Sequence, residues 1–195
     1  MKRPGLNELK HIMEGCSRRS FLKWSLMLMA ALQLPGEVFA SLSAPSMSGE
    51  HLIHLYNPNT GEFFKDVFWA DGNYVFESLV AINVLFRDHH NETVKSIDTN
   101  LVDLLYRMQT YIGAKNPLGI VCGYRSAETN ALLRKKYRRV AKNSYHIEGM
   151  AADVRVPGVP TSSLKKLALL LQGGGVGYYP RSRFVHMDTG PVRHW

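Results

Sequence analysis

Two short segments in the last third of the chain alternate between polar and apolar residues, and this alternation restricts the fold more than any other feature of the sequence. Residues 151–156 set Asp153 opposite a row of small aliphatic side chains, and residues 184–188 set His186 and Asp188 opposite a valine and a methionine. Successive side chains of a strand point to opposite faces. We therefore expect two half-buried strands whose polar faces carry these three residues into a cleft.

The remaining pattern predicts further strands and helices in a mixed order. Strands are expected over residues 51–56, 62–69, 74–75 and 118–122. Helices are expected over 77–89, from Asp98 or Thr99 to Tyr111, after Ser126 with Leu132 and Leu133 on the inner side, and from Thr161 or Ser162 to the glycines at 173–175. The chain is therefore predicted to be an α+β protein, with helices packed on a small, mainly antiparallel sheet.

Four further histidines and a cysteine could bind a metal or act as a nucleophile, but their positions favour an ordinary surface or packing role. His51 and His54 are three residues apart in an expected strand, so they point to opposite faces, and both are predicted to be surface residues. His89 and His90 are interpreted as the solvated end of a helix. Cys122 ends a short apolar run and is predicted to be a small, buried, apolar side chain.

The start of the chain carries the pattern of an export signal. Ser17–Lys23 contains the pair Arg18 and Arg19 followed by Phe-Leu-Lys, and this segment resembles the twin-arginine signal closely. The apolar run at 24–34 is about half of the ~20 residues needed to cross a bilayer, so no stable membrane anchor is expected. We expect export by the twin-arginine translocase to the periplasm, with cleavage after Ala40.

The predicted cleavage divides the chain into a signal peptide at 1–40, a flexible lead-in at 41–50 that is rich in Ser, Pro and Gly, and one domain over 51–195. The formal net charge of the whole chain is +8, and a positive charge could favour binding to nucleic acid or to an anionic wall polymer. No basic stripe interleaved with aromatic residues and no nucleic-acid motif is present in the sequence. We interpret the charge as a solubilising surface and expect no nucleic-acid partner.

Two histidines and an aspartate form the candidate metal site. Gly149 permits a tight bend that can fold His146 back towards Asp153, and the last alternating strand supplies His186. Two imidazoles and one carboxylate leave the fourth tetrahedral position of a zinc ion for water, as in catalytic zinc sites. Spacing alone is also compatible with three unrelated side chains. Arg125, directly after an expected strand, could stabilise an oxyanion or hold a substrate carboxylate.

The same residues carry a family resemblance. The pattern Ser-x-His-x-x-Gly-x-Ala-x-Asp, from Ser144 to Asp153, followed by a strand histidine, resembles the D-Ala-D-Ala metallopeptidase and hedgehog-like zinc peptidase superfamily. Within it, a proteobacterial branch of exported murein endopeptidases, the MepK-like (YcbK-like) enzymes, is similar at Gly123–Ser126, Lys142–His146, Gly173–Ser182 and Phe184–Trp195. The resemblance extends over essentially the whole chain from the signal onwards.

The resemblance implies a zinc metallopeptidase with one Zn²⁺ per chain, whose partner is peptidoglycan and which hydrolyses peptide cross-links. In this branch the links are the 3-3 links between diaminopimelate residues. The implied metal ligands are His146, Asp153 and His186. Arg125 is implied to contact the carbonyl or the oxyanion, and Ser144 to orient substrate or a ligand. Tyr124 and Tyr178 are expected at the substrate.

The chain departs from the superfamily at the general base. Many relatives carry Glu or Asp three residues before the last zinc histidine, or His two residues before it, where this chain has Arg183 and Phe184. Asp188 is the first candidate for the base, and it could equally orient an imidazole. His194 is a further candidate, whereas Glu148 is expected to face solvent. Two other functions stay open: a carboxypeptidase that trims terminal D-Ala, and a wall-binding module that keeps zinc without catalysis.

Overall fold

A computed structural model describes residues 49–113, 116–137 and 140–195. The predicted signal peptide, with Arg18 and Arg19, and the lead-in up to residue 48 lie outside the described residues. None of the helices in the described part combines the length and the apolar composition that a bilayer crossing requires.

Eight strands form one sheet, and their order in it is β3-β2-β1-β4-β5-β7-β6-β8. The strands are β1 (His51–Tyr56), β2 (Phe63–Ala70), β3 (Asn73–Tyr74), β4 (Leu118–Cys122), β5 (Ala151–Arg155), β6 (Gly175–Tyr179), β7 (Phe184–Asp188) and β8 (Arg193–His194). The β1–β4 and β6–β8 pairs are parallel, and the other neighbours are antiparallel. The predicted α+β class with a mainly antiparallel sheet is confirmed.

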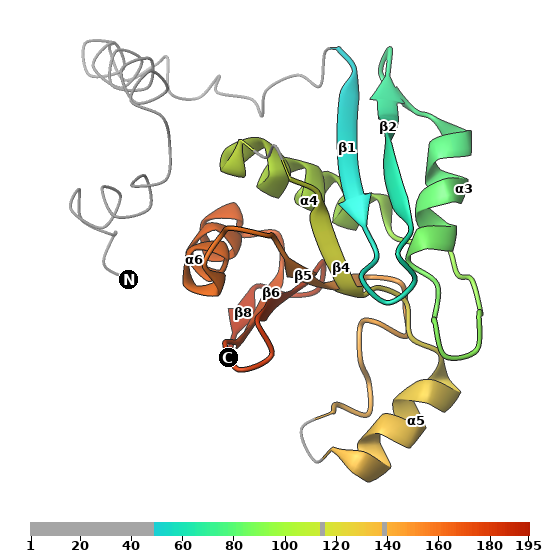
Figure 1. Cartoon of the computed structure of the whole chain (residues 1–195), viewed down its shortest axis with the longest axis vertical. Coiled ribbons are helices and arrows are strands. Elements are labelled where there is room, and N and C mark those ends of the chain that lie inside the picture. Colours follow the sequence, from blue (N-terminus) through green and yellow to red (C-terminus); the bar gives the residue numbers. More distant parts are fainter. Residues whose placement is uncertain (1–48, 114–115, 138–139) are drawn as a thin grey trace, which may run out of the picture. The chain divides into compact units, whose positions relative to one another are not determined.

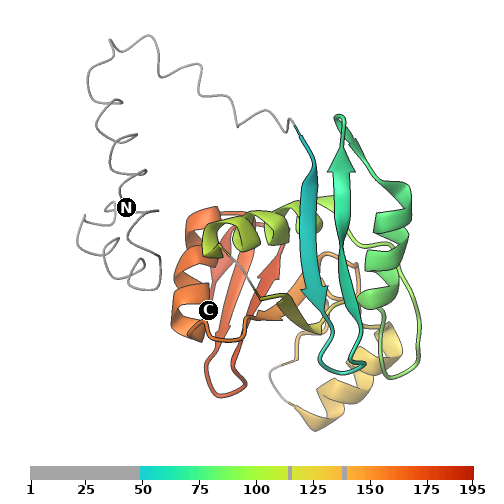
Figure 2. The same cartoon turned by 45° about the horizontal axis from the view of Figure 1, so that its top comes forward.

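Four helices are present in the described part of the chain: α3 (Phe76–Leu85), α4 (Thr99–Ile112), α5 (Ala127–Lys136) and α6 (Thr161–Leu171). Helix α3 packs on β2, α4 packs on β1 and on α6, and α6 packs on β6 and β7 (Figure 1). Figure 2 shows α4 and α6 lying together against the sheet, while α5 projects below it. The helices α4 and α6 therefore cover one face of the sheet and leave the other face of β5 and β7 free to carry a site.

The ends of the helices follow the predicted caps in two cases. The side chain of Asp98 accepts a hydrogen bond from the amide of Asn100, and that of Ser126 accepts one from the amide of Thr129, so each satisfies an N-terminal amide of its helix. The predicted cap of α6 is wrong, because Thr161 is its first helical residue and no side chain caps it. The expected helix over 77–89 ends at Leu85.

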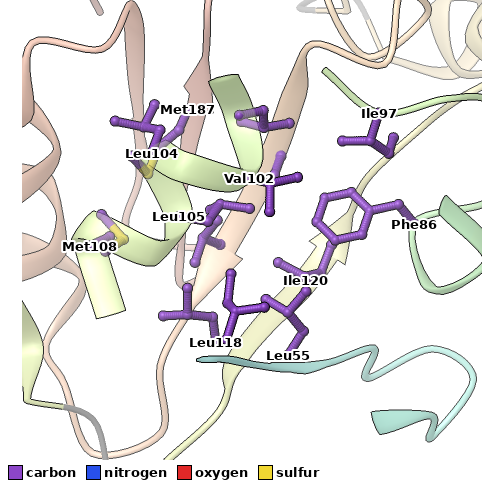
Figure 3. Packing of buried hydrophobic residues seen from close by; sticks show 14 of the residues in the cluster. Leu55, Phe86, Ile97, Val102, Leu104, Leu105, Met108, Leu118, Ile120 and Met187 are labelled. Carbon is purple, nitrogen blue, oxygen red and sulfur yellow. The ribbon is translucent and has the colours of Figure 1, made fainter. Parts of the chain in front are cut away.

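The core lies between α4 and the sheet. Helix α4 buries five apolar residues, and they meet apolar side chains of β1, β4 and β7 (Figure 3). The buried helical set is Leu101, Val102, Leu104, Leu105 and Met108. On β7, Val185 and Met187 belong to this core, as the alternation predicts. Since the apolar sides of β5 and β7 are fixed against the helices, their polar sides must face away from them.

Two predictions about the exposure of side chains outside the site are wrong. His51 is only 7% exposed, because it shares the core-facing side of β1 with Ile53 and stacks on Tyr106 of α4, with ring centroids 4.4 Å apart. Leu132 is 64% exposed, because α5 buries the polar pair Thr129 and Asn130 rather than its leucines. The expectation that His51 and His54 point to opposite faces of the strand is confirmed, since only His54 lies on the less buried side.

Candidate metal centre

Three neighbouring strands bring a row of polar side chains together on the face opposite to the core. Asp153 of β5 pairs in register with His186 of β7, and on its other side with Cys122 of β4. The next pair along β5 and β7 is Val154 with Val185, which lies in the core. The predicted alternation of both segments is therefore confirmed, and it places Asp153 and His186 side by side on one face.

His146 reaches the same place from a tight turn that precedes β5. The amide of Met150 donates to the carbonyl oxygen of Tyr145 at 3.0 Å, which closes the turn. Gly149 has a φ of 72° in this turn, and a Cβ added there would lie 2.5 Å from the carbonyl oxygen of Ser96. The predicted bend at Gly149 is confirmed, and it returns the imidazole of His146 to the sheet.

The three predicted ligand side chains converge at their donor atoms. His146 Nε2 lies 3.1 Å from His186 Nδ1, and Asp153 Oδ1 lies 3.3 Å from the former atom and 3.0 Å from the latter. A tetrahedral zinc ion with bonds of about 2.0–2.1 Å to nitrogen and oxygen has ligand-to-ligand edges of about 3.3 Å. The triangle of donor atoms therefore has the dimensions of one face of a zinc tetrahedron, and these residues fit the metal.

The outer nitrogens of both imidazoles have their own partners. His146 Nδ1 lies 2.7 Å from the carbonyl oxygen of Gly123, and His186 Nε2 lies 2.9 Å from Asp188 Oδ2. Because a carbonyl and a carboxylate only accept hydrogen bonds, each outer nitrogen carries the proton and donates. The inner nitrogen of each neutral ring then presents its lone pair to the centre, which is the orientation that a metal ligand needs.

The charge balance of the cluster also calls for a cation. Burial opposes the charged form of His146, but the neighbouring side chains of Cys122 and Asp153 outweigh it and raise the pKa of His146 well above its usual value. Burial likewise opposes ionisation of Asp153, but the neighbouring His146 and His186 hold its pKa well below the usual range. The carboxylate thus stays ionised, and a proton or a metal ion must balance it.

Asp188 is buried behind His186 and its oxygens are fully engaged. It is 0% exposed, and besides His186 it accepts hydrogen bonds from the amides of Gly175 and Gly190. Both terminal nitrogens of Arg193 also donate to it, at 3.0 Å and 2.8 Å. Burial opposes its ionisation, but these donors keep its pKa well below the usual range. The geometry fits an orienting role better than that of a general base.

Arg193 and Trp195 are functional candidates that the sequence argument missed. The guanidinium of Arg193 lies between the rings of Tyr145 and Trp195, 5.1 Å and 5.2 Å from their centroids. Trp195 in turn lies 5.3 Å from the ring of His186 and covers Gly177, where an added Cβ would meet the indole at 2.8 Å. The density of basic and aromatic residues in the last five positions is the signal that could have pointed to them.

Cys122 is placed differently from its prediction. Its side chain is partly exposed, and its Sγ lies with the donor atoms of His146 and Asp153 in a group whose members are all within 4.8 Å of one another. The register between β4 and β5 shifts between Ile120 and Cys122. This bulge turns Cys122 away from the core side, where Ile120 lies, and onto the side of Asp153.

Arg125 and Ser144 lie beside the cluster and contact each other. One terminal nitrogen of Arg125 donates to Ser144 Oγ at 3.3 Å, and the amide of Arg125 donates to the carbonyl oxygen of His146. Arg125 Nε is buried and has no hydrogen-bond partner among the described residues. Arg125 and Tyr124 also line a pocket that Cys122 borders; its lining residues are Asp88, His89, His90, Cys122, Tyr124, Arg125, Thr129 and Leu133.

Tyr178, which is expected at the substrate, is not brought to the cluster. It pairs with Val185 on β7 and packs on the core side of the sheet, with Lys165 of α6 over its ring at 5.0 Å. Tyr179 is one residue further along β6 and therefore points to the other face. There it stacks on Phe184, and its hydroxyl accepts a hydrogen bond from Trp195 Nε1 at 2.9 Å.

His194, the remaining candidate for the base, lies at the surface, and so does Glu148. His194 is exposed on the edge strand β8. Glu148 is exposed and pairs with Lys95 at 3.4 Å, as the expectation that it faces solvent requires. Neither His194 nor Glu148 belongs to the group of donor atoms described above.

Comparison with known proteins places the chain in a family. The family model described as peptidoglycan L,D-endopeptidase MepK matches residues 46–195. The Escherichia coli K12 protein named peptidoglycan L,D-endopeptidase MepK is 44% identical over 179 residues, which cover 92% of this chain and 97% of the relative. The protein of the same name from Shigella flexneri has the same identity and coverage.

A more distant relative gives the same result. The Haemophilus influenzae protein named probable peptidoglycan L,D-endopeptidase MepK is 41% identical over 180 residues, which cover 92% of this chain and 95% of the relative. The family model covers the strands, the turn at Gly149 and every donor atom of the cluster. The chain is therefore a member of the MepK family of the M15 peptidase superfamily, as the resemblance of its motifs predicted.

Proposed function

We propose that the protein is a zinc-dependent murein endopeptidase that hydrolyses peptide cross-links in peptidoglycan. The observation that carries the proposal is the convergence of His146 Nε2, His186 Nδ1 and Asp153 Oδ1 within 3.0–3.3 Å of one another, with both imidazoles held in the orientation of metal ligands. Three protein ligands are typical of a catalytic rather than a structural zinc site. One zinc ion per chain is proposed.

We assign the substrate from the family. The relatives are named L,D-endopeptidases of peptidoglycan, and a 3-3 link joins the L centre of one diaminopimelate to the D centre of the next. This supports the 3-3 link as the bond that is cut. An action on peptidoglycan also agrees with the proposed signal at Arg18 and Arg19, with export by the twin-arginine translocase, and with a periplasmic location for the domain at 51–195.

A zinc ion held by His146, Asp153 and His186 would supply Lewis-acid chemistry for the scissile carbonyl and an acidified water. The protein's own residues orient the reactants around it. The carbonyl of Gly123 and the carboxylate of Asp188 hold the two imidazoles in place, and Arg193 keeps Asp188 ionised. We thus assign Asp188 to orientation rather than to proton transfer.

Arg125 is the residue proposed to bind the reacting carbonyl or a substrate carboxylate. Its buried Nε has a donor to spare, and a buried unpaired donor is costly unless a ligand meets it. Ser144 Oγ holds the other side of the guanidinium. The pocket that Arg125 and Tyr124 line next to the cluster is proposed to hold part of the stem peptide.

The test compares His146→Ala with His90→Ala on purified cross-linked sacculi, with and without a chelator. His90 is a matched control, because it is a half-exposed histidine that lines the neighbouring pocket but not the cluster. We expect His146→Ala to lose both bound zinc and digestion, and His90→Ala to keep bound zinc while its digestion falls by less than about tenfold, since His90 lines the pocket proposed for substrate. Undiminished digestion by His146→Ala would defeat the proposal.

The products separate the proposed activity from its alternatives. Conversion of cross-linked muropeptide dimers to monomers indicates the endopeptidase, and loss of terminal D-Ala alone indicates a carboxypeptidase. Binding to sacculi without any product indicates a wall-binding module that keeps the metal. Digests of 3-3 and 4-3 dimers, run separately, test which link is cut.

A further inference from the structure

The bulge in β4 places a thiol where the proposed metal site has room for a fourth donor. Leu118 and Ile120 point into the core, so an unbroken strand would send Cys122 there too. The register shift after Ile120 pairs Cys122 with Asp153 instead, on the polar face of the sheet. Bulges of this kind re-aim a side chain, and this one aims a sulfur atom at two of the ligand side chains.

We propose that Cys122 Sγ is a fourth donor to the metal and closes the coordination shell in the substrate-free protein. Its Sγ and the donor atoms of His146 and Asp153 lie within 4.8 Å of one another. A zinc ion with bonds of about 2.3 Å to sulfur and about 2.0–2.1 Å to nitrogen has a sulfur-to-nitrogen edge of about 3.6 Å. To reach the fourth position, the thiol would turn towards the donor atoms of His146 and Asp153, with which it already forms one group.

The surroundings of Cys122 favour ligation over simple packing. The side chain is partly exposed rather than sealed in the core. Its polar contacts are the ring of His146, itself a predicted ligand, and the carbonyl oxygen of Gly123, which lies 3.7 Å from Sγ. A thiolate is the ligand that borderline-soft zinc binds well. These features leave the sulfur available to an ion held by its neighbours.

Ligation by Cys122 has a consequence for the active site. A catalytic zinc site keeps one open position, whereas four protein ligands are typical of a closed site. Cys122 also borders the pocket that Arg125 lines, so this residue is next to both the metal position and the place proposed for substrate. The thiolate must leave the metal before the reaction, and the protein is held in a resting form until it does. This inference rests on the proposed metal site.

The test uses cobalt as a spectroscopic probe in the full-length chain. Cys16 is replaced by Ser in all samples, so that Cys122 is the remaining cysteine of the sequence. The parent Cys16→Ser protein is compared with the same protein carrying Cys122→Ser or Cys122→Ala. We expect a thiolate-to-cobalt charge-transfer band in the parent and no such band in either Cys122 variant.

Two further readouts follow the zinc form. Zinc affinity in the Cys122 variants should fall by at least about tenfold, the smallest effect expected when a group that supports a metal is removed. Zinc should also protect Cys122 of the parent from alkylation by iodoacetamide, measured by mass spectrometry of the peptide that contains it. Sacculus digestion per bound zinc should rise in Cys122→Ser, because the fourth position is then open.

The outcomes distinguish this inference from the proposed function. A parent protein that binds cobalt and zinc stoichiometrically without a thiolate band, with the same zinc affinity as Cys122→Ser, overturns the role of Cys122 and leaves the three-ligand site intact. A parent that binds neither metal overturns the site itself. Asp153→Asn in the same background serves as the reference for a protein without the metal.

Discussion

Two pairs of histidines in the described part of the chain lie ring against ring beside an aspartate, and they behave differently. The rings of His146 and His186 are 5.0 Å apart next to Asp153, and those of His89 and His90 are 4.2 Å apart next to Asp88. By ring distance alone, the second pair would be the better metal site.

The aspartates explain the difference. Asp88 is committed to the backbone, because its two oxygens accept from the amides of Ser126 and His90 at 2.9 Å and 3.0 Å. Asp153 instead turns one oxygen to both imidazoles of its pair. Neighbours in sequence share a turn, whereas residues brought together by strand pairing can direct their donor atoms at one point. A candidate metal centre is therefore identified by lone pairs that converge on one point, and not by rings that lie close together.

The largest expected difference between the two regions is in zinc affinity when each aspartate is neutralised. Asp153→Asn removes a charged donor from the cluster, and we expect zinc affinity to fall by more than about 100-fold, beyond the effect of losing a supporting group. Asp88→Asn should leave zinc affinity within about twofold and cost stability instead, about 1–3 kcal/mol for a buried acceptor that loses charged hydrogen bonds. Chelator competition and chemical denaturation measure the two effects. Equal zinc affinities in the two variants would contradict the assignment of Asp153, and not Asp88, to the metal centre.

The next effect concerns the support behind the cluster. Asp188→Asn keeps the shape of the side chain but weakens its hold on His186 Nε2, and we expect zinc affinity to fall by about 10- to 100-fold. Arg193→Lys keeps a charge next to Asp188 and should cost less than Arg193→Ala. Chelator competition ranks the three variants. If Asp188→Asn binds zinc like the parent but loses digestion, Asp188 is the general base and not an orienting group.

The third effect concerns the titration of the histidines, because their pKa values are shifted in opposite directions in the two regions. The pKa of His146 is raised, so the metal-free folded protein still holds that proton near neutral pH, and zinc must displace it. Zinc affinity should therefore increase with pH, by about tenfold per pH unit while one proton is displaced, until the raised pKa is passed. The pKa of His89 is lowered by burial and by His90, so its ring loses its proton at lower pH.

Nuclear magnetic resonance of the histidine rings tests this prediction directly. In the metal-free protein His146 should stay protonated at a pH where His89 is already neutral. Added zinc should abolish the titration of His146 and leave that of His89 in place. Zinc affinity that is constant between about pH 5 and pH 8 would contradict the assignment of His146 as a ligand.

The smallest effect is expected from the histidine pair that does not converge. The double variant His89→Ala/His90→Ala should bind zinc within about twofold of the parent, since substitutions away from a site have small effects. Its digestion of sacculi should fall by less than about tenfold, because both side chains line the pocket proposed for substrate. A loss of zinc in this variant would show that the two regions are one site.

Much of the site could be predicted because it depends on local rules. The two-residue period fixed the faces of β5 and β7, and Gly149 marked the bend that carries His146. The rest depends on long-range pairing. Cys122 changes face through a bulge that shows only when β4 meets β5, and Arg193 reaches Asp188 because β8 pairs with β6.

The placement of single residues depends on long-range contacts in the same way. Tyr178 and Tyr179 are neighbours with similar chemistry, and only the register of β6 against β7 decides which of them shares the face of His186. His51 is buried because Tyr106 of α4 happens to lie over it, a contact between residues far apart in sequence. Local patterns define faces of a strand, but they leave open what covers each face.

The row of Cys122, Asp153 and His186 across β4, β5 and β7 has a consequence for how the domain comes apart. An ion gripped there would tie together distant stretches of chain, much as a disulfide does in small secreted domains. Ligand binding to the native state alone adds its free energy to that of folding. Release of the ion would remove that contribution from the centre of the sheet, so this domain would resist heat and proteolysis less when zinc is scarce.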